Sequence, residues 1–232
     1  MIRGIEASRS GMAVEQLRTD VLADNIANMN TTGFKRASAT SVEFDQMLLH
    51  RMEDPTDAGP QPVGILGNGA RVDQVVVDER QGDIYETGRP LDLAIEGPGY
   101  FLALRLDGSL YRTRNGAFQR MADGTITTVE GYPLLVEDAE GGRAPLVVPD
   151  GEPAFAADGT VLVGDQPVGR LALDGATAET RLHARHLEAS NVDLAKEMSD
   201  LIVTLRAYQV NQRALRAQDE TLERAVTEIG KV

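Results

Sequence analysis

The chain of 232 residues contains no cysteine and no tryptophan, and only 4% of its residues are aromatic. Without cysteine the protein forms neither disulfides nor thiolate metal sites, and it would tolerate an oxidising compartment. With so few aromatic side chains, a β core must be modest in size. The sequence therefore predicts a core built mostly from leucine, valine and isoleucine.

Basic residues are also scarce. The chain has 36 acidic and 23 basic residues, a formal net charge of -13. This balance argues against nucleic acid and anionic membrane surfaces as partners. No apolar run is long enough to span a bilayer, and the N-terminus lacks the apolar core of a cleaved signal peptide. We therefore expect no nucleic-acid binding, no membrane insertion and no cleaved signal peptide.

The last 39 residues carry an apolar pattern with a seven-residue period. One row is Leu194, Leu201, Tyr208, Leu215, Leu222 and Ile229, and a second row, three or four residues away, is Met198, Leu205, Gln212, Asp219 and Val226. This spacing favours a coiled-coil helix, about 50 Å long. Because a compact domain could not bury such a helix along its whole length, the seam needs other helices, from this chain or from neighbours. A long surface helix of a bundle is the alternative.

The first thirty residues predict a second, weaker amphipathic helix. Its heptad positions are Ile5, Ser8, Met12, Glu15, Thr19, Leu22, Ile26 and Met29. Asn28, Asn30 and Gly33 tolerate the left-handed conformation that closes a helix. At the start of the C-terminal helix, Ser190 or Asn191 can accept hydrogen bonds from the first free amides.

Polar residues in the C-terminal seam lead to a hypothesis about register. If the two terminal helices pack antiparallel, equal rise along both places Gln212 near Arg9 and Asp219 near Arg3. A partly exposed pair of carboxylate and arginine is roughly neutral to about 1 kcal/mol favourable, whereas an unpaired carboxylate at a seam position is costly. We therefore expect this polar notch to fix the register of the helices. Fraying into solvent or contact with a neighbouring subunit are the alternatives.

Between the helices the sequence becomes rich in glycine, proline and Asp-Gly turns. Asp-Gly pairs begin at Asp107, Asp123 and Asp158, and each is followed by Ser or Thr entering a short strand. Asp-Gly supplies the positive φ that a tight hairpin turn demands. We expect a small antiparallel barrel or sandwich from Asp92 to Leu187. Calcium-binding loops are disfavoured because oxygen ligands at alternate positions are missing.

The stretch from Ala37 to Arg89 predicts an extended arm, because Asp54-Pro55 and the prolines that follow disfavour regular helix. Its glycine cluster at residues 64–69 lacks the spacing of a phosphate-binding loop and is interpreted as a bend. Residues 71–79 alternate enough to be a strand.

Together these patterns predict an α+β fold with three parts. Residues 1–36 and 188–232 form long terminal helices in a discontinuous coiled-coil domain. Residues 37–90 form the connecting arm with short β segments, and residues 91–187 form a mainly antiparallel β domain.

Candidate catalytic residues are few. His183 and His186, with Glu188 nearby, could begin a metal site, but His50 lies far away in sequence. A solvated pair at a domain junction is the favoured interpretation. No serine lies in the G-x-S-x-G setting of a hydrolase. We therefore expect no catalytic, cofactor-binding or metal-binding residues.

Five segments, in order along the chain, resemble the bacterial flagellar rod and hook proteins. They are residues 24–36 (DNIANMNTTGFKR), 92–101, 111–118, 190–198 and 206–211. The motif residues are Asn25, Asn28, Asn30, Thr31, Gly33, Phe34, Ser190, Asn191 and Val192. The chain departs from the family pattern at Asp24, where a second Asn is frequent, and the stretch before Ser190 is shorter than in the fullest members.

The resemblance implies a structural protein rather than an enzyme. Such proteins are exported unfolded through the flagellar type III apparatus and polymerise helically into the axial drive shaft of the basal body, in the cell envelope. Expected partners are further copies of the chain, other rod and hook proteins and the export apparatus. The expected interface residues are Ile5, Met12, Leu22, Ile26, Leu194, Met198, Leu201, Leu205, Tyr208, Leu215, Leu222 and Val226.

Within the family, the arm resembles that of distal rather than proximal rod subunits. A proximal rod subunit is the alternative inside the family. Outside it, a secreted coiled-coil stalk or adhesin would need a cleaved signal, and a small metal-dependent enzyme would use His183 and His186.

Overall fold

The computed structural model describes residues 2–43, 47–51, 61–66, 69–137, 142–148, 151–164 and 166–229. The chain forms two compact units that interleave along the sequence. The helical unit comprises Met1–Ala27, Ala37–Asp78 and Asp193–Val232, and the β unit comprises Asn28–Arg36 and Glu79–Val192. The fold is α+β, as predicted, and the units group the arm with the terminal helices rather than separating it.

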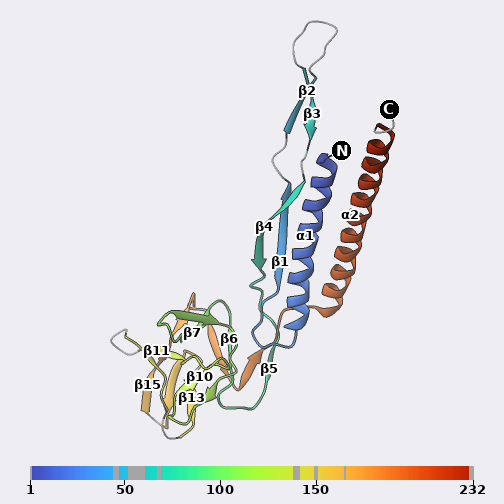
Figure 1. Cartoon of the computed structure of the whole chain (residues 1–232). Coiled ribbons are helices and arrows are strands. Elements are labelled where there is room, and N and C mark those ends of the chain that lie inside the picture. Colours follow the sequence, from blue (N-terminus) through green and yellow to red (C-terminus); the bar gives the residue numbers. More distant parts are fainter. Residues whose placement is uncertain are drawn as a thin grey trace. The chain divides into compact units, whose positions relative to one another are not determined.

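The helical unit contains two long helices, α1 (Ile2–Ala27) and α2 (Leu194–Ile229), which lie side by side (Figure 1). On another side, α1 is flanked by the antiparallel strands β1 (Ala37–Glu43) and β4 (Ala70–Val77) (Figure 1). Because α1 contacts both α2 and the strands, its covered surface is wider than one seam. This explains why its apolar pattern is weaker than that of α2.

The helix ends differ in detail from the expectation. The carboxylate of Asp193 accepts hydrogen bonds from the backbone N of Ala195 at 2.9 Å and of Lys196 at 3.3 Å, so it caps α2 in place of Ser190 or Asn191. A carboxylate there also suits the positive end of the helix dipole.

The turn that follows α1 uses one of the three residues expected to be left-handed. Gly33 has a φ of +67°, whereas Asn28 and Asn30 keep negative φ. Asn28 instead accepts the backbone N–H of Thr31 at 3.0 Å.

The arm is a paired β structure. The expected strand at residues 71–79 is found as β4, paired with β1, and the register shifts between Thr40 and Ser41. Further out, β2 (Met47–Arg51) pairs antiparallel with β3 (Gln61–Leu66). The end of the expected bend, at residues 67 and 68, lies outside the described residues.

The β unit is antiparallel throughout. Its largest sheet has the order β12-β11-β15-β14-β13, and smaller sheets pair β16-β7-β8, β17-β6, β18-β5 and β10-β9. The strands are β5 (Ile84–Glu86), β6 (Leu93–Glu96), β7 (Tyr100–Leu104), β8 (Leu110–Thr113), β9 (Gln119–Arg120), β10 (Ile126–Thr127), β11 (Leu135–Glu137), β12 (Arg143–Pro145), β13 (Pro153–Phe155), β14 (Thr160–Val163), β15 (Gln166–Leu171), β16 (Leu173–Asp174), β17 (Arg181–Ala184) and β18 (His186–Glu188).

The three Asp-Gly turns work as predicted. Gly108, Gly124 and Gly159 have φ of +81°, +84° and +92°. In each turn the aspartate carboxylate accepts the backbone N–H two residues later, from Ser109, Thr125 and Thr160, at 2.8, 2.9 and 3.0 Å. The Ser or Thr after each Asp-Gly therefore holds the aspartate across the turn.

The core of the β unit is largely aliphatic, as the composition predicts, with two phenylalanines in contact. The rings of Phe101 and Phe118 meet edge to face at 5.1 Å between centroids. Around them lie Leu93, Ile95, Ile126, Leu134, Val136, Leu146, Val148, Val161, Leu171 and Leu182.

Candidate functional site

One predicted row of α2 lies on the face toward α1. Leu201, Tyr208, Leu215 and Leu222 are half-buried. They alternate on this face with four polar residues, each seven positions from the next: Glu197, Thr204, Asn211 and Gln218. The second row on the covered face is therefore polar, one residue away from the Met198 row that the pattern predicts.

The predicted second row is mostly exposed within the chain. Met198, Leu205 and Val226 are exposed, Met198 by 52% and Val226 by 69%. Leu194, the first residue of the other row, is exposed as well. Ile202 is exposed by 51% and shares the spacing of Leu194, Met198 and Leu205. Residues three, four or seven positions apart lie on one side of a helix. We call Leu194, Met198, Ile202 and Leu205 the outer stripe of α2.

The predicted interface residues of α1 lie in covered surface. Leu22 is buried, and Ile5, Met12 and Ile26 are half-buried. These four differ from the outer stripe, since neighbouring elements of the same unit already cover them. The side chain of Ile229 lies outside the described residues.

The helices pack antiparallel at the expected register, and the residues found facing each other across them are neighbours of those in the notch hypothesis. Gly11 faces Asn211, and Gly4 faces Gln218. Arg9 and Asp219 are exposed. Gly11 and Asn211 lie two and one positions from Arg9 and Gln212, and each step of one residue turns the side-chain direction by about 100°. The pairing of Arg3 with Asp219 stays a prediction. The side chain of Arg3 lies outside the described residues.

The motif segment after α1 is fixed within the β unit. The backbone N–H of Gly33 donates to the carbonyl of Glu188 at 2.8 Å, and that of Arg36 donates to Oδ1 of Asn191 at 2.7 Å. A Cβ on Gly33 would lie 2.3 Å from the carbonyl carbon of Arg114. Positive φ and this close approach both require glycine.

The other motif residues divide by burial. Asn25 is buried in the helical unit, Phe34, Ser190 and Val192 are half-buried, and Asn30 and Thr31 are exposed.

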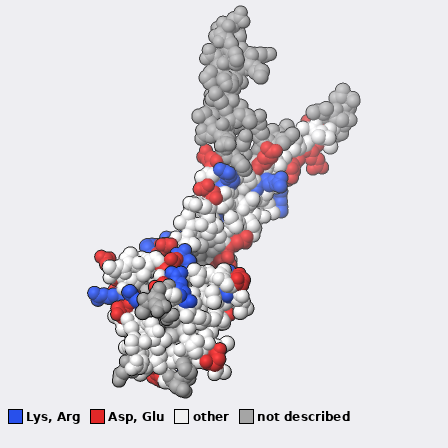
Figure 2. Space-filling view, turned by 90° about the vertical axis from the view of Figure 1, so that its left-hand side faces the viewer, with Lys and Arg blue, Asp and Glu red and all other residues white. Residues whose placement is uncertain are grey.

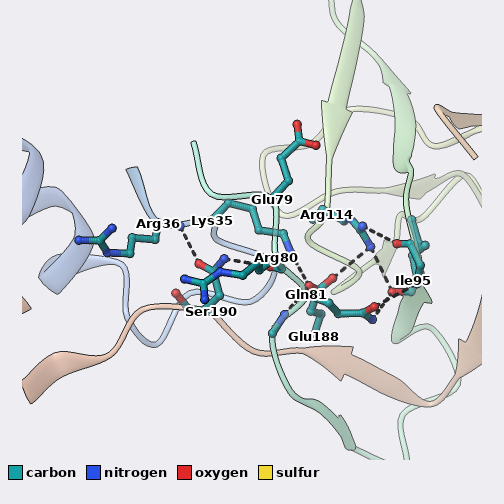
Figure 3. A network of polar contacts seen from close by, with 12 residues as sticks. Lys35, Arg36, Glu79, Arg80, Gln81, Ile95, Arg114, Glu188 and Ser190 are labelled. Carbon is teal, nitrogen blue, oxygen red and sulfur yellow. Dashed lines mark hydrogen bonds and ion pairs between the residues drawn. The ribbon is translucent and has the colours of Figure 1, made fainter. Parts of the chain in front are cut away.

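Glu188 is a buried carboxylate between two cations (Figure 3). It accepts from Nζ of Lys35 at 2.5 Å, from Nη1 of Arg114 at 3.3 Å and from the backbone N of Gly82 at 3.0 Å. The side chain of Glu188 is 1% exposed, that of Lys35 7% and that of Arg114 5%. We call Lys35, Arg114 and Glu188 the Glu188 cluster. A buried charge is tolerated only when paired and hydrogen-bonded, so each member depends on the others.

Backbone carbonyls complete the surroundings of Arg114. Its Nη1 donates to the carbonyl of Ile95 at 3.1 Å and its Nη2 to that of Gly97 at 2.6 Å. Among the residues that the structure describes, its Nε finds no partner. The guanidinium also lies 5.6 Å from the ring centroid of Tyr100. Burial raises the pKa of Tyr100, as does Glu79, which accepts its hydroxyl at 3.2 Å.

The histidine pair does not recruit Glu188. His183 contacts Glu96 at 2.7 Å, and Nδ1 of His186 contacts the carbonyl of Ala184 at 2.8 Å. The hydrogen bond with His183 lowers the pKa of Glu96. In the described ranges, no three ligating side chains gather where they could hold a metal ion. The pair is therefore part of the surface of the β unit.

Charges of both signs are interspersed on the face of the β unit seen in Figure 2, and uncharged side chains cover most of it. The net negative charge is not concentrated on this face. Within the part of the chain that the structure describes, no helix is both long and apolar enough to cross a membrane.

Three segments match family models. Residues 5–35 match "Flagella basal body rod protein", residues 94–163 "Flagellar hook protein FlgE/F/G D1 domain", and residues 183–228 "Flagellar basal body rod FlgEFG protein C-terminal". The flagellar basal-body rod protein FlgG of Agrobacterium fabrum is 33% identical, with 94% of this chain and 96% of the relative covered. FlgG of Bacillus subtilis is 32% identical (97% and 98% covered), and FlgG of Caulobacter vibrioides 31% (96% and 97%).

The chain belongs to the flagellar basal-body rod protein family. The three family segments meet in the Glu188 cluster. Lys35 closes the N-terminal match, Arg114 lies in the central match, and Glu188 lies in the C-terminal match. The cluster therefore joins three parts of the family sequence that are far apart in this chain.

Sequence reasoning missed this cluster. In the sequence, Lys35 is part of the motif at residues 24–36, and Glu188 stands out only as a possible metal ligand beside His186. One feature of the sequence could have indicated the cluster. Arg114 directly follows β8 and Glu188 ends β18, and neither has a charged residue next to it in the sequence. Pairing the two nevertheless requires the fold.

Proposed function

We propose that the protein is a structural subunit of the flagellar basal-body rod, which polymerises helically and transmits torque to the hook. The observation that carries the proposal is the outer stripe of α2. Its four apolar side chains are exposed in the single chain at a spacing that suits another helix. A polymer of identical subunits would cover each stripe.

In the rod, α1 and α2 form a coiled-coil layer. Leu201, Tyr208, Leu215 and Leu222 serve the pairing of the two helices within one subunit. The outer stripe and Val226 make contacts between subunits. This assignment explains why the heptad pattern of α2 has more apolar residues than α1 can cover.

The three-part division gives each region a role. Residues 1–36 and 188–232 polymerise, residues 37–90 connect, and residues 91–187 form the outer β domain. We place the subunit in the distal rod because of its long arm, which the name FlgG of the relatives supports. Its partners are further copies, other rod and hook proteins and the export apparatus that delivers it to the cell envelope.

The test replaces one residue of the outer stripe. Met198→Asp places a carboxylate where a neighbouring subunit would exclude water, and desolvating that charge is costly. We expect loss of motility when the variant replaces the natural protein, and no filaments in negative-stain micrographs of concentrated protein. Helical circular dichroism should be unchanged, since Met198 is exposed in the subunit.

Ser199→Asp is the matched control, because Ser199 is the next residue, is exposed and lies about 100° around the helix from Met198. It should support motility. A Met198→Asp protein that enters rods and supports motility would show that the outer stripe is not an interface.

A further inference from the structure

Polar side chains of α2 face α1 at regular spacing, and each lies opposite one residue of α1, with a hydrogen bond at Asn25. Seven residues forward along α1 correspond to seven residues back along α2. The pairs are Gly4 with Gln218, Gly11 with Asn211 and Asn25 with Glu197. We call these three pairs the polar ladder. Thr204, buried at the intervening position of α2, continues the same period.

The rung between Asn25 and Glu197 is buried. Nδ2 of Asn25 donates to Oε2 of Glu197 at 2.9 Å, and both side chains belong to residues that are 0% exposed. Asn25 also forms two hydrogen bonds with Ala37, the first residue of β1. Its Nδ2 donates to the carbonyl of Ala37 at 2.7 Å, and its Oδ1 accepts the backbone N–H of Ala37 at 2.9 Å. One amide thus joins both helices and the first strand of the arm.

At the other two rungs, glycine leaves room for an amide of α2. A Cβ on Gly4 would lie 2.7 Å from Nε2 of Gln218, and a Cβ on Gly11 would lie 2.9 Å from Nδ2 of Asn211. Glycine inside a helix is unfavourable by about 0.5–1 kcal/mol relative to alanine. Both glycines are therefore placed where their small size leaves room for the amides of α2.

We propose that the polar ladder sets the register of α1 against α2, and that Asn25 and Glu197 are its register-determining pair. A slip of one heptad in either direction separates Asn25 from Glu197. If α2 slides by seven residues toward the C-terminal end of α1, Glu197 lies past Ala27, the last residue of α1. If α2 slides the other way, Gln218 lies past Ile2, the first residue of α1. An apolar seam alone would tolerate both slips, because its leucines repeat with the same period.

This register concerns the folded single chain, so its test is independent of rod assembly. The chain has no cysteine, which allows two spin labels at chosen sites. Gln16→Cys and Glu220→Cys use exposed positions of α1 and α2. In the observed register they are separated by about 21 Å along the helix axis, and a slip of one heptad changes this by about 10 Å. Electron–electron double resonance measures the distance.

The decisive variant is Glu197→Leu, which removes the rung but leaves both hydrogen bonds between Asn25 and Ala37 possible. We expect one narrow distance peak in the labelled parent chain. Glu197→Leu should add a second population displaced by about 10 Å, the length of one heptad along the axis. Glu197→Gln, which keeps an acceptor for Asn25, should restore the single peak.

Glu223→Leu is the matched control, since Glu223 is an exposed glutamate of the same helix, and it should leave the peak unchanged. A single unshifted peak in Glu197→Leu with helical circular dichroism retained would overturn the proposal. Loss of the helices in that variant would also overturn it, because the pair would then provide stability rather than register. A broad distribution in the parent chain would contradict it as well.

Discussion

The two units of the molecule differ in how much apolar surface each buries. Among the described residues of the helical unit, the buried apolar residues are Val14 and Leu22, whereas the buried polar residues are Ser8, Asn25, Glu197 and Thr204. The β unit instead encloses a continuous apolar cluster that includes Phe101, Leu134 and Leu146, each 0% exposed. The helical unit also exposes a row of apolar residues along α2, the outer stripe.

This difference indicates where each unit obtains its stability. A fully buried Leu or Phe side chain contributes about 1.5–3 kcal/mol, whereas a typical hydrogen bond contributes about 0.5–1.5 kcal/mol. The β unit therefore has an internal source of stability. The helical unit has specific polar contacts with little apolar burial, so we expect it to gain stability when a partner covers the outer stripe.

The largest expected effect is in the core of the β unit. Phe101→Ala should lower the free energy of unfolding by about 3–5 kcal/mol, because it removes a fully buried ring and leaves a cavity beside Phe118. Denaturant unfolding can be followed by tyrosine fluorescence, since there is no tryptophan and four of the five tyrosines, all but Tyr208, lie in this unit.

Leu106→Ala is the control for this measurement, because Leu106 is 97% exposed. It should change the unfolding free energy by less than about 0.5 kcal/mol. Equal effects of the two substitutions would mean that the apolar cluster is not the source of stability of the β unit.

The second effect concerns the Glu188 cluster, the main buried charge of the β unit. Glu188→Gln leaves Lys35 and Arg114 without their carboxylate, and breaking a buried pair in this way costs about 3–5 kcal/mol. Glu137→Gln makes the same change in a pair with Arg143 whose side chains are 38% and 45% exposed. That control should cost no more than about 1 kcal/mol.

A second variant separates the charge from the packing of this cluster. Adding Lys35→Met to Glu188→Gln removes one of the two uncompensated cations, so it should recover part of the lost stability in the same unfolding experiment. A further loss instead would indicate that the packing of Lys35, rather than its charge, stabilises the cluster.

The sequence predicts local structure well where one residue determines the backbone. The Asp-Gly turns appear with the expected positive φ, and Gly33 takes the left-handed conformation. The two terminal helices also follow from the apolar pattern, and their antiparallel direction agrees with the assumption made for the register. In each case the cause is contained in a few neighbouring residues or in a single periodicity.

The sequence does not predict which face of α2 meets α1. Apolar periodicity marks every apolar side of a helix, whether this chain or another subunit covers that side. The pattern therefore places Met198 and Leu205 in the same seam as Leu201. The structure places polar Glu197 and Thr204 beside Leu201 instead. Nor does it reveal the Glu188 cluster, because a charged residue is normally exposed and its buried partners are distant in sequence.

The smallest expected effect is the response of the β turns to acid. Hydrogen bonds from Ser109, Thr125 and Thr160 lower the pKa of Asp107, Asp123 and Asp158 below the ordinary value of 3.8. A carboxyl whose pKa is lower in the folded state stabilises that state above the unfolded pKa. The contribution is lost as the pH falls through the folded pKa.

The measurement compares unfolding free energies at several pH values between neutrality and the acid range below 3.8. Asp123→Asn keeps an acceptor for the N–H of Thr125 but cannot titrate, so its stability should fall less steeply with acid than that of the parent chain. Asp219→Asn, at an exposed position of α2, is the matched control and should keep the parent's dependence for the β unit. An identical acid dependence in Asp123→Asn and the parent would show that this turn does not contribute to the stability of the β unit through its charge.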